Sequence, residues 1–373
     1  MGKDTVNPRN MNPKRIAARL GFWLLRMAVV ATAGLGLLTL LGLFSPEFWL
    51  ADRAADLRVQ VALALALLGI GLAVTRHLAI AAGASLLALV NLLLLWPLLA
   101  AGMPRVAPGW WPAQWLPAPT VAAAEPFVPL PHHSLEVFSL NVWYRNRNYR
   151  AVRDAVRAAG PDVAVFLEVT PRWARELALL RDGWPHQQWI RGEGHDGVMI
   201  VSRMPWKAAH AVVLSGEGGA EAVRVTLDLG GQAVEVVGAH LRWPVTPGSA
   251  RERGAALAGL ANLARALPHP VVVVGDLNLT PHDGAFARLL AAGGLTNAAA
   301  ASGLLTTWPA ATGAMARRLP GLQIDHCLVS HGIVTESLTL GPWVGSDHRP
   351  VMARLSVPLG LSAPAEGRST SRP

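Results

Sequence analysis

The fold is decided by the stretch Val271-Val-Val-Val-Gly-Asp-Leu-Asn-Leu-Thr-Pro281. Four consecutive valines predict a strand that is buried on both faces. Asp276 and Asn278 follow Gly275, and because they lie two residues apart, an extended backbone points both side chains to the same side. A carboxylate and a carboxamide at the end of a buried strand suit a hard cation, an attacking water or a phosphate oxygen. The same residues also suit an ordinary Asx turn, so this stretch alone leaves both interpretations open.

Outward from this strand, residues 135–355 alternate between predicted strands and helices. Strands are expected at about residues 135–142, 163–169, 197–202, 209–214, 222–229, 233–241, 324–329 and 351–355, and helices at about 148–159, 171–181, 249–266 and 284–292. Four of these strands follow one another with no long helix between them. Such a mixture of hairpins and crossovers predicts an α/β fold with two packed mixed sheets and outer helices, rather than one parallel sheet.

Several predicted strands end in polar residues that their apolar runs do not predict. The set consists of Asn141, Glu168, His240, Asp276, Asn278, Asp325, His326, Asp347 and His348. Any one of them alone is more simply a rim charge or an ordinary histidine. Six strand ends that all carry Asn, Asp, Glu or His indicate a site, and these donors, without thiolates, favour a hard divalent metal and phosphate chemistry. His326 should point away from its neighbour Asp325 on an extended strand, which predicts a structural role for it.

Six motifs, taken in order, resemble the endonuclease/exonuclease/phosphatase superfamily. They read Ser-Leu-Asn141, Phe-Leu-Glu168, Gly-Ala-His240-Leu, Gly-Asp276-Leu-Asn278, Ile-Asp325-His326 and Gly-Ser-Asp347-His348-Arg-Pro. That group includes pancreatic-type deoxyribonucleases, apurinic endonucleases, neutral sphingomyelinases and inositol polyphosphate phosphatases. The resemblance covers about residues 134–357 and implies a four-layer α/β sandwich. Gly-Asp-x-Asn alone is a weak signal, and the Ser-Asp-His motif and the strand-end Glu make the match specific.

The resemblance implies a metal site. Glu168 resembles the principal metal-binding carboxylate, with Asn141 beside it and Asp347 as a further carboxylate. The expected ion is Mg²⁺, with Mn²⁺ as the alternative, because a hard cation binds phosphate oxygens and screens charge that develops in the transition state.

The resemblance also implies the catalytic residues. His348 resembles the catalytic histidine, and Asp325 resembles the carboxylate that fixes the orientation of its imidazole. Asp276 resembles the residue that orients or deprotonates the attacking water. Asn278 is expected to donate to the phosphate, and His240 to contact its non-bridging oxygens.

The substrate is the least determined part of this prediction. No long basic insertion is present that would follow a nucleic-acid backbone. Arg242 and Trp243 follow His240 and could line a substrate pocket, and Arg145 could contact a phosphorylated substrate or lie in a solvated loop. The expected substrates are therefore phosphate esters of a nucleic acid, a phospholipid or an inositol phosphate, and the sequence gives no basis for a protein partner.

Three apolar runs precede this region, at about residues 21–44, 59–74 and 78–101. Each is near the length that a helix needs to cross a bilayer, although the second is short. Buried helices of a globular core are the alternative, but three such runs would leave almost no polar face. A signal peptide is the alternative for the first run, and the two runs that follow it weigh against that interpretation. We therefore predict three transmembrane helices, which resemble those of a membrane-anchored bacterial branch of the superfamily.

The flanking charges predict the orientation of these helices. Residues 1–20 carry five basic residues and one acid, whereas only Arg105 appears between the third run and Arg145. Basic residues favour the cytoplasmic side, so we expect a bacterial inner-membrane protein whose N-terminus is cytoplasmic and whose catalytic domain is periplasmic or extracellular. The expected segments are a basic arm at 1–20, transmembrane helices at 21–101, a linker rich in Pro and Trp at 102–133, a catalytic domain at 134–357 and a disordered tail at 358–373.

The composition agrees with a membrane-anchored domain. Of the 373 residues, 52% are hydrophobic and 15% are charged, and the mean hydropathy is +0.33, which is too apolar for a plain soluble domain. The net charge is +9, but residues 135–355 contribute only about +3 of it, which is less than a typical nucleic-acid-binding domain would carry. The single cysteine, Cys327, excludes an internal disulfide and a multi-cysteine metal site.

These observations predict a membrane-anchored, metal-dependent hydrolase of phosphate esters. The first choice is a phosphodiesterase of nuclease type, and the alternative is a lipid or inositol-phosphate phosphatase of the same fold. A non-catalytic, membrane-anchored binding module is a further alternative, but such a module should have lost at least one motif residue, and all of them are present. A transporter is disfavoured because the three runs contain almost no polar residue other than Asn91.

Overall fold

The structure, a computed structural model, describes residues 13–45, 48–101, 132–192, 194–216, 220–309 and 320–359. The chain forms two units, Met1–Leu95 and Trp96–Pro373, and each is described by itself. Most of the predicted linker at 102–133 and of the predicted tail at 358–373 lies outside the described residues, as does the first part of the predicted basic arm.

The valine run forms β8 (Val271–Asp276), and all of its residues are buried. It pairs in parallel with β7 (Gln232–His240) and antiparallel with β10 (Asp325–Ser330). Gly275 has a φ of +149°, and a Cβ there would lie 1.9 Å from the carbonyl oxygen of Ala239. Only glycine therefore lets β8 lie this close to β7 at the point where the valine run gives way to Asp276.

Two six-stranded mixed sheets form the centre of the second unit. The first has the order β11-β12-β1-β2-β4-β3, and the second has the order β5-β6-β7-β8-β10-β9. The remaining strands are β1 (His132–Asn141), β2 (Val163–Leu167), β3 (His186–Ile190), β4 (Val198–Ser202), β5 (Trp206–Val213), β6 (Glu221–Leu229), β9 (Leu295–Asn297), β11 (Val334–Leu340) and β12 (Val351–Pro358). Apolar side chains of both sheets form one shared core, in which Val165 and Ile200 contact the opposite sheet near Gly238.

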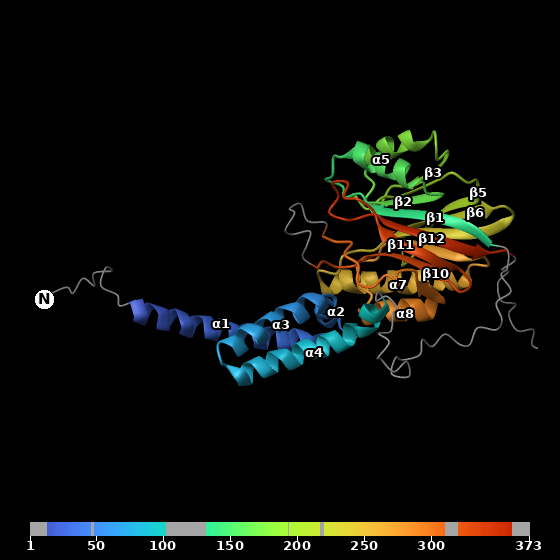
Figure 1. The fold of residues 1–373 in the computed structure, drawn as a ribbon. Helices are drawn as coiled ribbons and strands as arrows, with labels where there is room; N and C mark the ends of the chain where they lie inside the picture. The colour runs from blue at the N-terminus through green and yellow to red at the C-terminus, as the bar shows by residue number, and fades with distance from the viewer. Residues whose placement is uncertain are drawn as a thin grey trace, which may run out of the picture. The chain divides into compact units, whose positions relative to one another are not determined.

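Helices cover the outer faces of both sheets, as Figure 1 shows. The helices α5 (Tyr149–Ala159) and α6 (Pro171–Leu177), followed by a short 3₁₀ turn at Ala178–Leu180, pack on the first sheet. The helices α7 (Pro247–Ala266) and α8 (Gly284–Gly293) pack on the second. The order helix, sheet, sheet, helix is the predicted four-layer α/β sandwich, and the prediction of the fold is confirmed.

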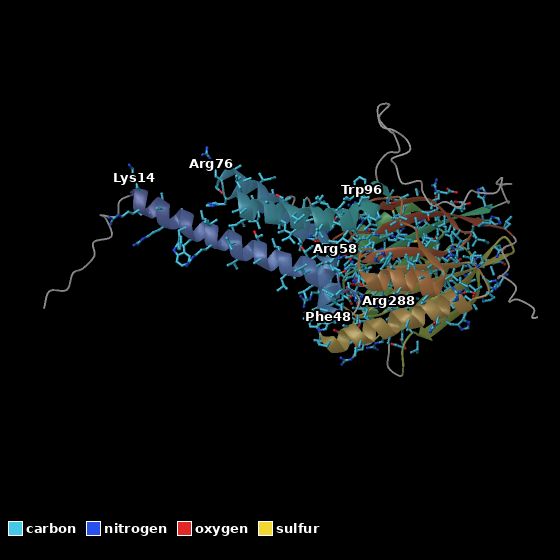
Figure 2. All side chains as sticks on the ribbon, turned by 90° about the horizontal axis from the view of Figure 1, so that it is seen from below. Lys14, Phe48, Arg58, Arg76, Trp96 and Arg288 are labelled. Atoms are coloured by element: carbon cyan, nitrogen blue, oxygen red, sulfur yellow. The ribbon has the colours of Figure 1, made fainter. Side chains whose placement is uncertain are left out.

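The first unit contains the helices α1 (Pro13–Gly42), α2 (Trp49–Asp56) and α3 (Arg58–Val74) and most of α4 (Leu78–Ala101). All except α2, which carries three charged residues, are apolar. Two helices among the described residues, Lys14–Gly42 and Leu78–Ala100, are long and apolar enough to cross a membrane. The pair α2 and α3 is bent by 60° and would make a third span if it crosses as one element. Helix α1 starts at Pro13, inside the predicted basic arm. Figure 2 places Lys14 and Arg76 at the same end of this unit.

Candidate active site

Strand register brings most of the predicted polar residues to one end of the two sheets. In the first sheet, β1 ends at Asn141 beside the end of β2, which Glu168 follows. In the second, His240 lies opposite Asp276, and Asp276 lies opposite Asp325. The two groups meet because the Asn141 Nδ2 atom donates both to Glu168 Oε1, at 3.0 Å, and to Asp276 Oδ2, at 3.2 Å. The candidate site therefore spans both sheets.

The imidazole of His348 is buried and bound to Asp325. Its Nδ1 atom lies 2.8 Å from Asp325 Oδ2, and its Nε2 atom lies 3.7 Å from Asp276 Oδ2. Burial lowers the pKa of His348, but the charge of Asp325, the hydrogen bond with it and the charge of Asp276 together raise that pKa to about 10. The structure therefore favours a protonated imidazole that donates through Nδ1 to Asp325 and directs Nε2 toward Asp276.

Asp276 lies at the centre of the group. Its Oδ1 atom accepts the backbone N–H of Asn278 at 3.0 Å, so the Asx turn is present. Its Oδ2 atom faces Asn141, His348 and His240. Burial and the charge of Asp325 raise the pKa of Asp276 to about 6, although the two histidines and the Asn141 amide oppose the shift. A carboxylate with a pKa in this range is well matched to take a proton from water.

Asn278 is held firmly in place. Its Nδ2 atom donates to the Leu241 carbonyl at 2.7 Å, and its backbone carbonyl accepts a hydrogen bond from Arg253. Its Oδ1 atom is buried without a hydrogen-bond partner among the described residues. One N–H of its amide is therefore engaged, and the expected donation to a phosphate, which would use the other, stays a prediction.

Three residues at the site, other than glycine, have left-handed backbones. The φ angles of Trp143, Glu168 and Asn278 are 57°, 56° and 51°. This conformation is strained for residues that carry a Cβ, and such strain clusters at functional sites. Each of the three lies at or just after the end of a strand that carries one of the predicted motifs.

Glu168, Asn141 and Asp347 form the acidic side of the site. Glu168 Oε2 accepts the backbone N–H of Tyr144 at 3.0 Å, and Asp347 Oδ2 accepts the indole N–H of Trp308 at 3.2 Å. Asp347 Oδ1 is buried without a hydrogen-bond partner among the described residues.

Burial raises the pKa of Asp347, and the nearby charge of Glu168 raises it further, against the opposing effects of His348 and of the Trp308 hydrogen bond. The two carboxylates are thus close enough to repel each other, and one of them has an unused buried oxygen. This donor set fits a hard divalent cation, which would neutralise the repulsion.

A second group of metal donors consists of Asp276, Asp325 and His348, whose ligand atoms lie within 4.8 Å of one another. In this group, however, His348 Nδ1 is already bound to Asp325. A protonated imidazole has no lone pair for a metal. The geometry therefore suits proton transfer at this group better than metal binding.

His240 is nine-tenths buried and lies between two carboxylates. Its Nε2 atom is 3.8 Å from Asp276 Oδ2, and its Nδ1 atom is 3.9 Å from Asp196 Oδ1. Asp196 was not predicted from the sequence, because it lies in a short loop before β4 rather than at a strand end. The Gly-His-Asp-Gly pattern at residues 194–197 is the signal that could have indicated it.

The two predicted substrate-binding arginines lie at the margin of the site. Arg242 is exposed, forms an ion pair of 3.4 Å with Glu252, and lines a pocket of about 570 Å³ that also contains His240 and Asp196. Arg145 is exposed and stacks on Tyr144, with 5.2 Å between its guanidinium carbon and the ring centroid. Both arginines are near the motif residues, and their contact with substrate stays a prediction.

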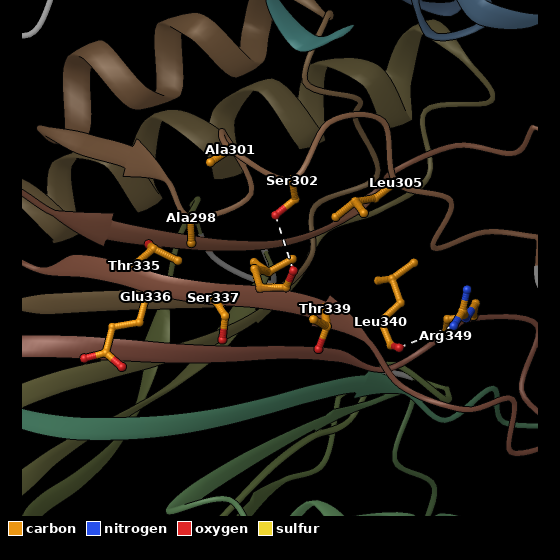
Figure 3. Close-up of a pocket in the computed structure, with 11 residues that line it drawn as sticks. Ala298, Ala301, Ser302, Leu305, Thr335, Glu336, Ser337, Thr339, Leu340 and Arg349 are labelled. Carbon is orange, nitrogen blue, oxygen red and sulfur yellow. Dashed lines mark hydrogen bonds between the residues drawn. The ribbon is translucent and has the colours of Figure 1, made fainter. Parts of the chain in front are cut away.

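Two further motif residues have structural partners. His326 is buried on the opposite side of β10 from Asp325, where its Nε2 atom lies 2.8 Å from the Leu279 carbonyl and its ring packs on Phe286 of α8. The guanidinium of Arg349 donates to the carbonyls of Leu340 and Gly341. Figure 3 shows Arg349 at one end of a hollow of about 590 Å³ along β11, among mostly small and aliphatic side chains.

Comparison with known proteins gives the following matches. No curated protein matches the chain. Three of the solved structures that are similar match over 60% of this chain. An endonuclease/exonuclease/phosphatase from Beutenbergia cavernae has 22% sequence identity, is covered over 72% of its own chain and gives a TM-score of 0.49. Sphingomyelinase C from Streptomyces griseocarneus has 20% identity, 99% coverage and a TM-score of 0.45, and TDP2 from C. elegans has 18% identity, 75% coverage and a TM-score of 0.48. Residues 138–348 match the family model described as Endonuclease/Exonuclease/phosphatase family, and this range holds every predicted catalytic and metal-binding residue. The chain therefore belongs to the endonuclease/exonuclease/phosphatase family.

Proposed function

We propose that this chain is a membrane-anchored, divalent-metal-dependent phosphoesterase, and that it most resembles a phosphodiesterase in its chemistry. One observation carries the proposal. The buried Asp325–His348 pair faces Asp276 on one side of the site, and the mutually repelling carboxylates of Glu168 and Asp347 lie on the other. The first group suits proton transfer and the second suits a cation. Hydrolysis of a phosphate ester can use both, the first to remove a proton from the attacking water and the second to neutralise the charge of the phosphate.

The proposed mechanism is in-line displacement by water. Asp276 orients a water molecule through Oδ2 and accepts its proton as the bond from the water oxygen to phosphorus forms and the bond from phosphorus to the leaving oxygen breaks. Protonated His348, held by Asp325, and His240 face the non-bridging oxygens and stabilise their charge. A cation held by Glu168, Asn141 and Asp347, which we propose to be Mg²⁺ with Mn²⁺ as the alternative, would supply further neutralisation of the phosphate.

The proposed location is a bacterial inner membrane, with the N-terminus in the cytoplasm and the catalytic domain outside it. The common end of Lys14 and Arg76 in the helical unit supports this orientation, because basic residues favour the cytoplasmic side. An alkaline phosphatase fusion after residue 373 tests it, and an inactive fusion would contradict the orientation.

The catalytic proposal is tested with the full chain in detergent. Hydrolysis of bis-p-nitrophenyl phosphate, p-nitrophenyl phosphate, plasmid DNA and sphingomyelin is measured with Mg²⁺ and with EDTA. We expect metal-dependent turnover that His348→Ala lowers by about 10²–10³-fold, the usual contribution of a donor that stabilises charge in the transition state. His210→Ala is the matched control, because His210 is exposed on β5. Equal rates in the two variants would refute the assignment, and the order of substrates decides between diesterase and phosphatase.

A further inference from the structure

Three tryptophans and one valine lie in segments that make contacts at or near Asp347 of the candidate site. Val245 donates its backbone N–H to the carbonyl of Trp243 at 3.0 Å, and the ring of Trp243 lies 5.0 Å from that of Trp308 in an edge-to-face contact. Trp308 donates to Asp347, and Trp343 donates to the carbonyl of Ser346, the residue before Asp347. We call these four residues, Trp243, Val245, Trp308 and Trp343, the aromatic rim.

Two tryptophans of the aromatic rim use their indole N–H groups at the candidate site. The indole N–H groups of Trp308 and Trp343 are both hydrogen-bonded beside Asp347, at 3.2 and 2.8 Å. The apolar parts are left toward the outside: Val245 is 65% exposed and Trp343 is 42% exposed. Single exposed apolar residues are ordinary on protein surfaces, but here Val245 follows closely on Trp243, which packs on Trp308, and both Trp308 and Trp343 are hydrogen-bonded at or next to the proposed metal ligand Asp347.

We infer that the aromatic rim docks on the headgroup region of a phospholipid bilayer and that the substrate is a phosphate ester of a membrane lipid. This inference rests on the proposed function, since it names the substrate class of the same site. Tryptophan is the side chain that most favours the membrane interface, where an apolar body and a hydrogen-bonded N–H are both accommodated. The phosphate of a lipid lies at headgroup depth, so a rim inserted there would bring it to Asp347 without removing the lipid from the bilayer.

The same chain contains helices that would anchor it in a membrane. Helices α1 and α4 are each long and apolar enough to cross a bilayer. Because the helices and the catalytic unit belong to one chain, a bilayer that the helices cross is a surface available to the site. A nucleic-acid substrate would favour a basic rim, and Arg242, the cation next to Trp243, is already paired with Glu252.

The test labels two matched valines in the full chain. The only cysteine, Cys327, is buried, and burial raises the pKa of its thiol to about 12, so it does not compete for a thiol-reactive dye. Val245→Cys places the dye on the aromatic rim. Val334→Cys is the control, because Val334 is 55% exposed and lies at the start of β11, the end of the sheet away from the site.

Each labelled chain is placed in nanodiscs of phosphatidylcholine and phosphatidylglycerol, with and without lipids that carry a doxyl quencher near the headgroup. We expect the dye at residue 245 to be quenched at least about twofold more than the dye at residue 334, and to shift its emission to the blue. Equal quenching at the two positions would overturn the inference. Because the readout needs no turnover, a quenched rim on an inactive chain would refute the proposed function alone, and an active chain with an unquenched rim would refute the docking alone.

A kinetic arm addresses the substrate class. Val245→Asp places a charge on the aromatic rim and should lower the ratio of the hydrolysis rate on vesicle phospholipid to the rate on bis-p-nitrophenyl phosphate by about tenfold. Val334→Asp should leave this ratio unchanged. A ratio that Val245→Asp does not change would contradict a lipid substrate that reaches the site through the rim.

Discussion

Replacing Asp325 by Asn should move the alkaline limb of the pH–rate profile. In the wild-type chain, the Asp325 carboxylate is the largest cause that raises the pKa of His348, which stands at about 10. If turnover needs the protonated imidazole, the rate should fall as the pH rises through this value. A charge-assisted hydrogen bond contributes about 1.5–3 kcal/mol, and about 1.4 kcal/mol corresponds to a tenfold change in an acid-dissociation constant. Asp325→Asn should therefore lower the pKa of His348 by about 1 to 2.

The assay is kcat against pH for the wild-type chain, Asp325→Asn and a control. Asp228→Asn is a suitable control, because Asp228 lies at the end of the β6–β7 pair away from His240, where it pairs with Lys207 and accepts the backbone N–H of Gly231. We expect the alkaline limb of Asp325→Asn to lie at a pH lower by about 1 to 2, and kcat at the optimum to fall by about 10²-fold because the imidazole loses its orienting partner. An unchanged alkaline limb in Asp325→Asn would refute the coupling between the two residues.

Four further predictions concern other parts of the catalytic unit. The pKa of Asp276 is raised to about 6, so if its ionised form takes the proton from water, kcat should increase as the pH rises through 6. Asp276→Asn should lower kcat by about 10²–10⁴-fold. A kcat that does not change between pH 5 and 7 would contradict this role. Trp308→Phe keeps the ring but removes the donor to Asp347, and should weaken Mn²⁺ binding severalfold in electron paramagnetic resonance titrations, whereas an unchanged affinity would show that the hydrogen bond does not position the carboxylate. Gly238→Ala places a Cβ 2.7 Å from a valine methyl of the facing sheet, and should lower the free energy of unfolding by about 1–3 kcal/mol in denaturant titrations. An unchanged denaturant concentration at the midpoint of unfolding would mean that the two sheets move apart enough to accommodate the methyl group. The pKa of the Cys327 thiol is higher in the folded chain than in the unfolded chain. The thiol's contribution to the free energy of unfolding should therefore be complete below about pH 9 and be lost as the pH rises toward 12. In Cys327→Ala, the free energy of unfolding should decrease less over this pH range, as measured by denaturant titration.

The sequence predicted the central strands and the site because both depend on short, local signals. Continuous apolar runs mark buried strands, and all six residues of β8 are buried as expected. The polar residues that follow such runs have no packing reason to be there, which is why Asn141, Glu168 and Asp276 could be singled out. Parallel pairing then brings the strand ends together, so residues far apart in the chain meet without any further signal.

Edge strands were missed for a related reason. The strands β3, β9 and β11 were not predicted, and each lies at an edge or is very short. The side chains of β3 are all only partly buried, so no alternation of polar and apolar residues marks it. Such strands take their register from a neighbour rather than from their own composition.

Contacts between loops that are distant in the sequence were not predicted either. Nothing in the chain order indicates that Trp308 would donate to Asp347 or that Asp196 would lie beside His240, because each pair joins loops that are far apart in the sequence. Helix α2 was also not predicted, because Asp52, Arg53 and Asp56 make this segment resemble a polar connection between two apolar runs.

The seam between the two sheets gives the site an unusual sensitivity. Asn141 and Glu168 belong to one sheet and Asp276 to the other, and the bond from Asn141 Nδ2 to Asp276 Oδ2 crosses the gap at 3.2 Å. Near it, Gly238 lets the sheets approach more closely than any side chain would permit. A change of a few tenths of an ångström in the spacing of the sheets would separate the proposed cation ligands from the proposed base while every strand stayed intact. The turnover rate should therefore depend on the spacing of the two sheets. Under hydrostatic pressure or in mild denaturant, the rate should fall before any spectroscopic sign of unfolding appears.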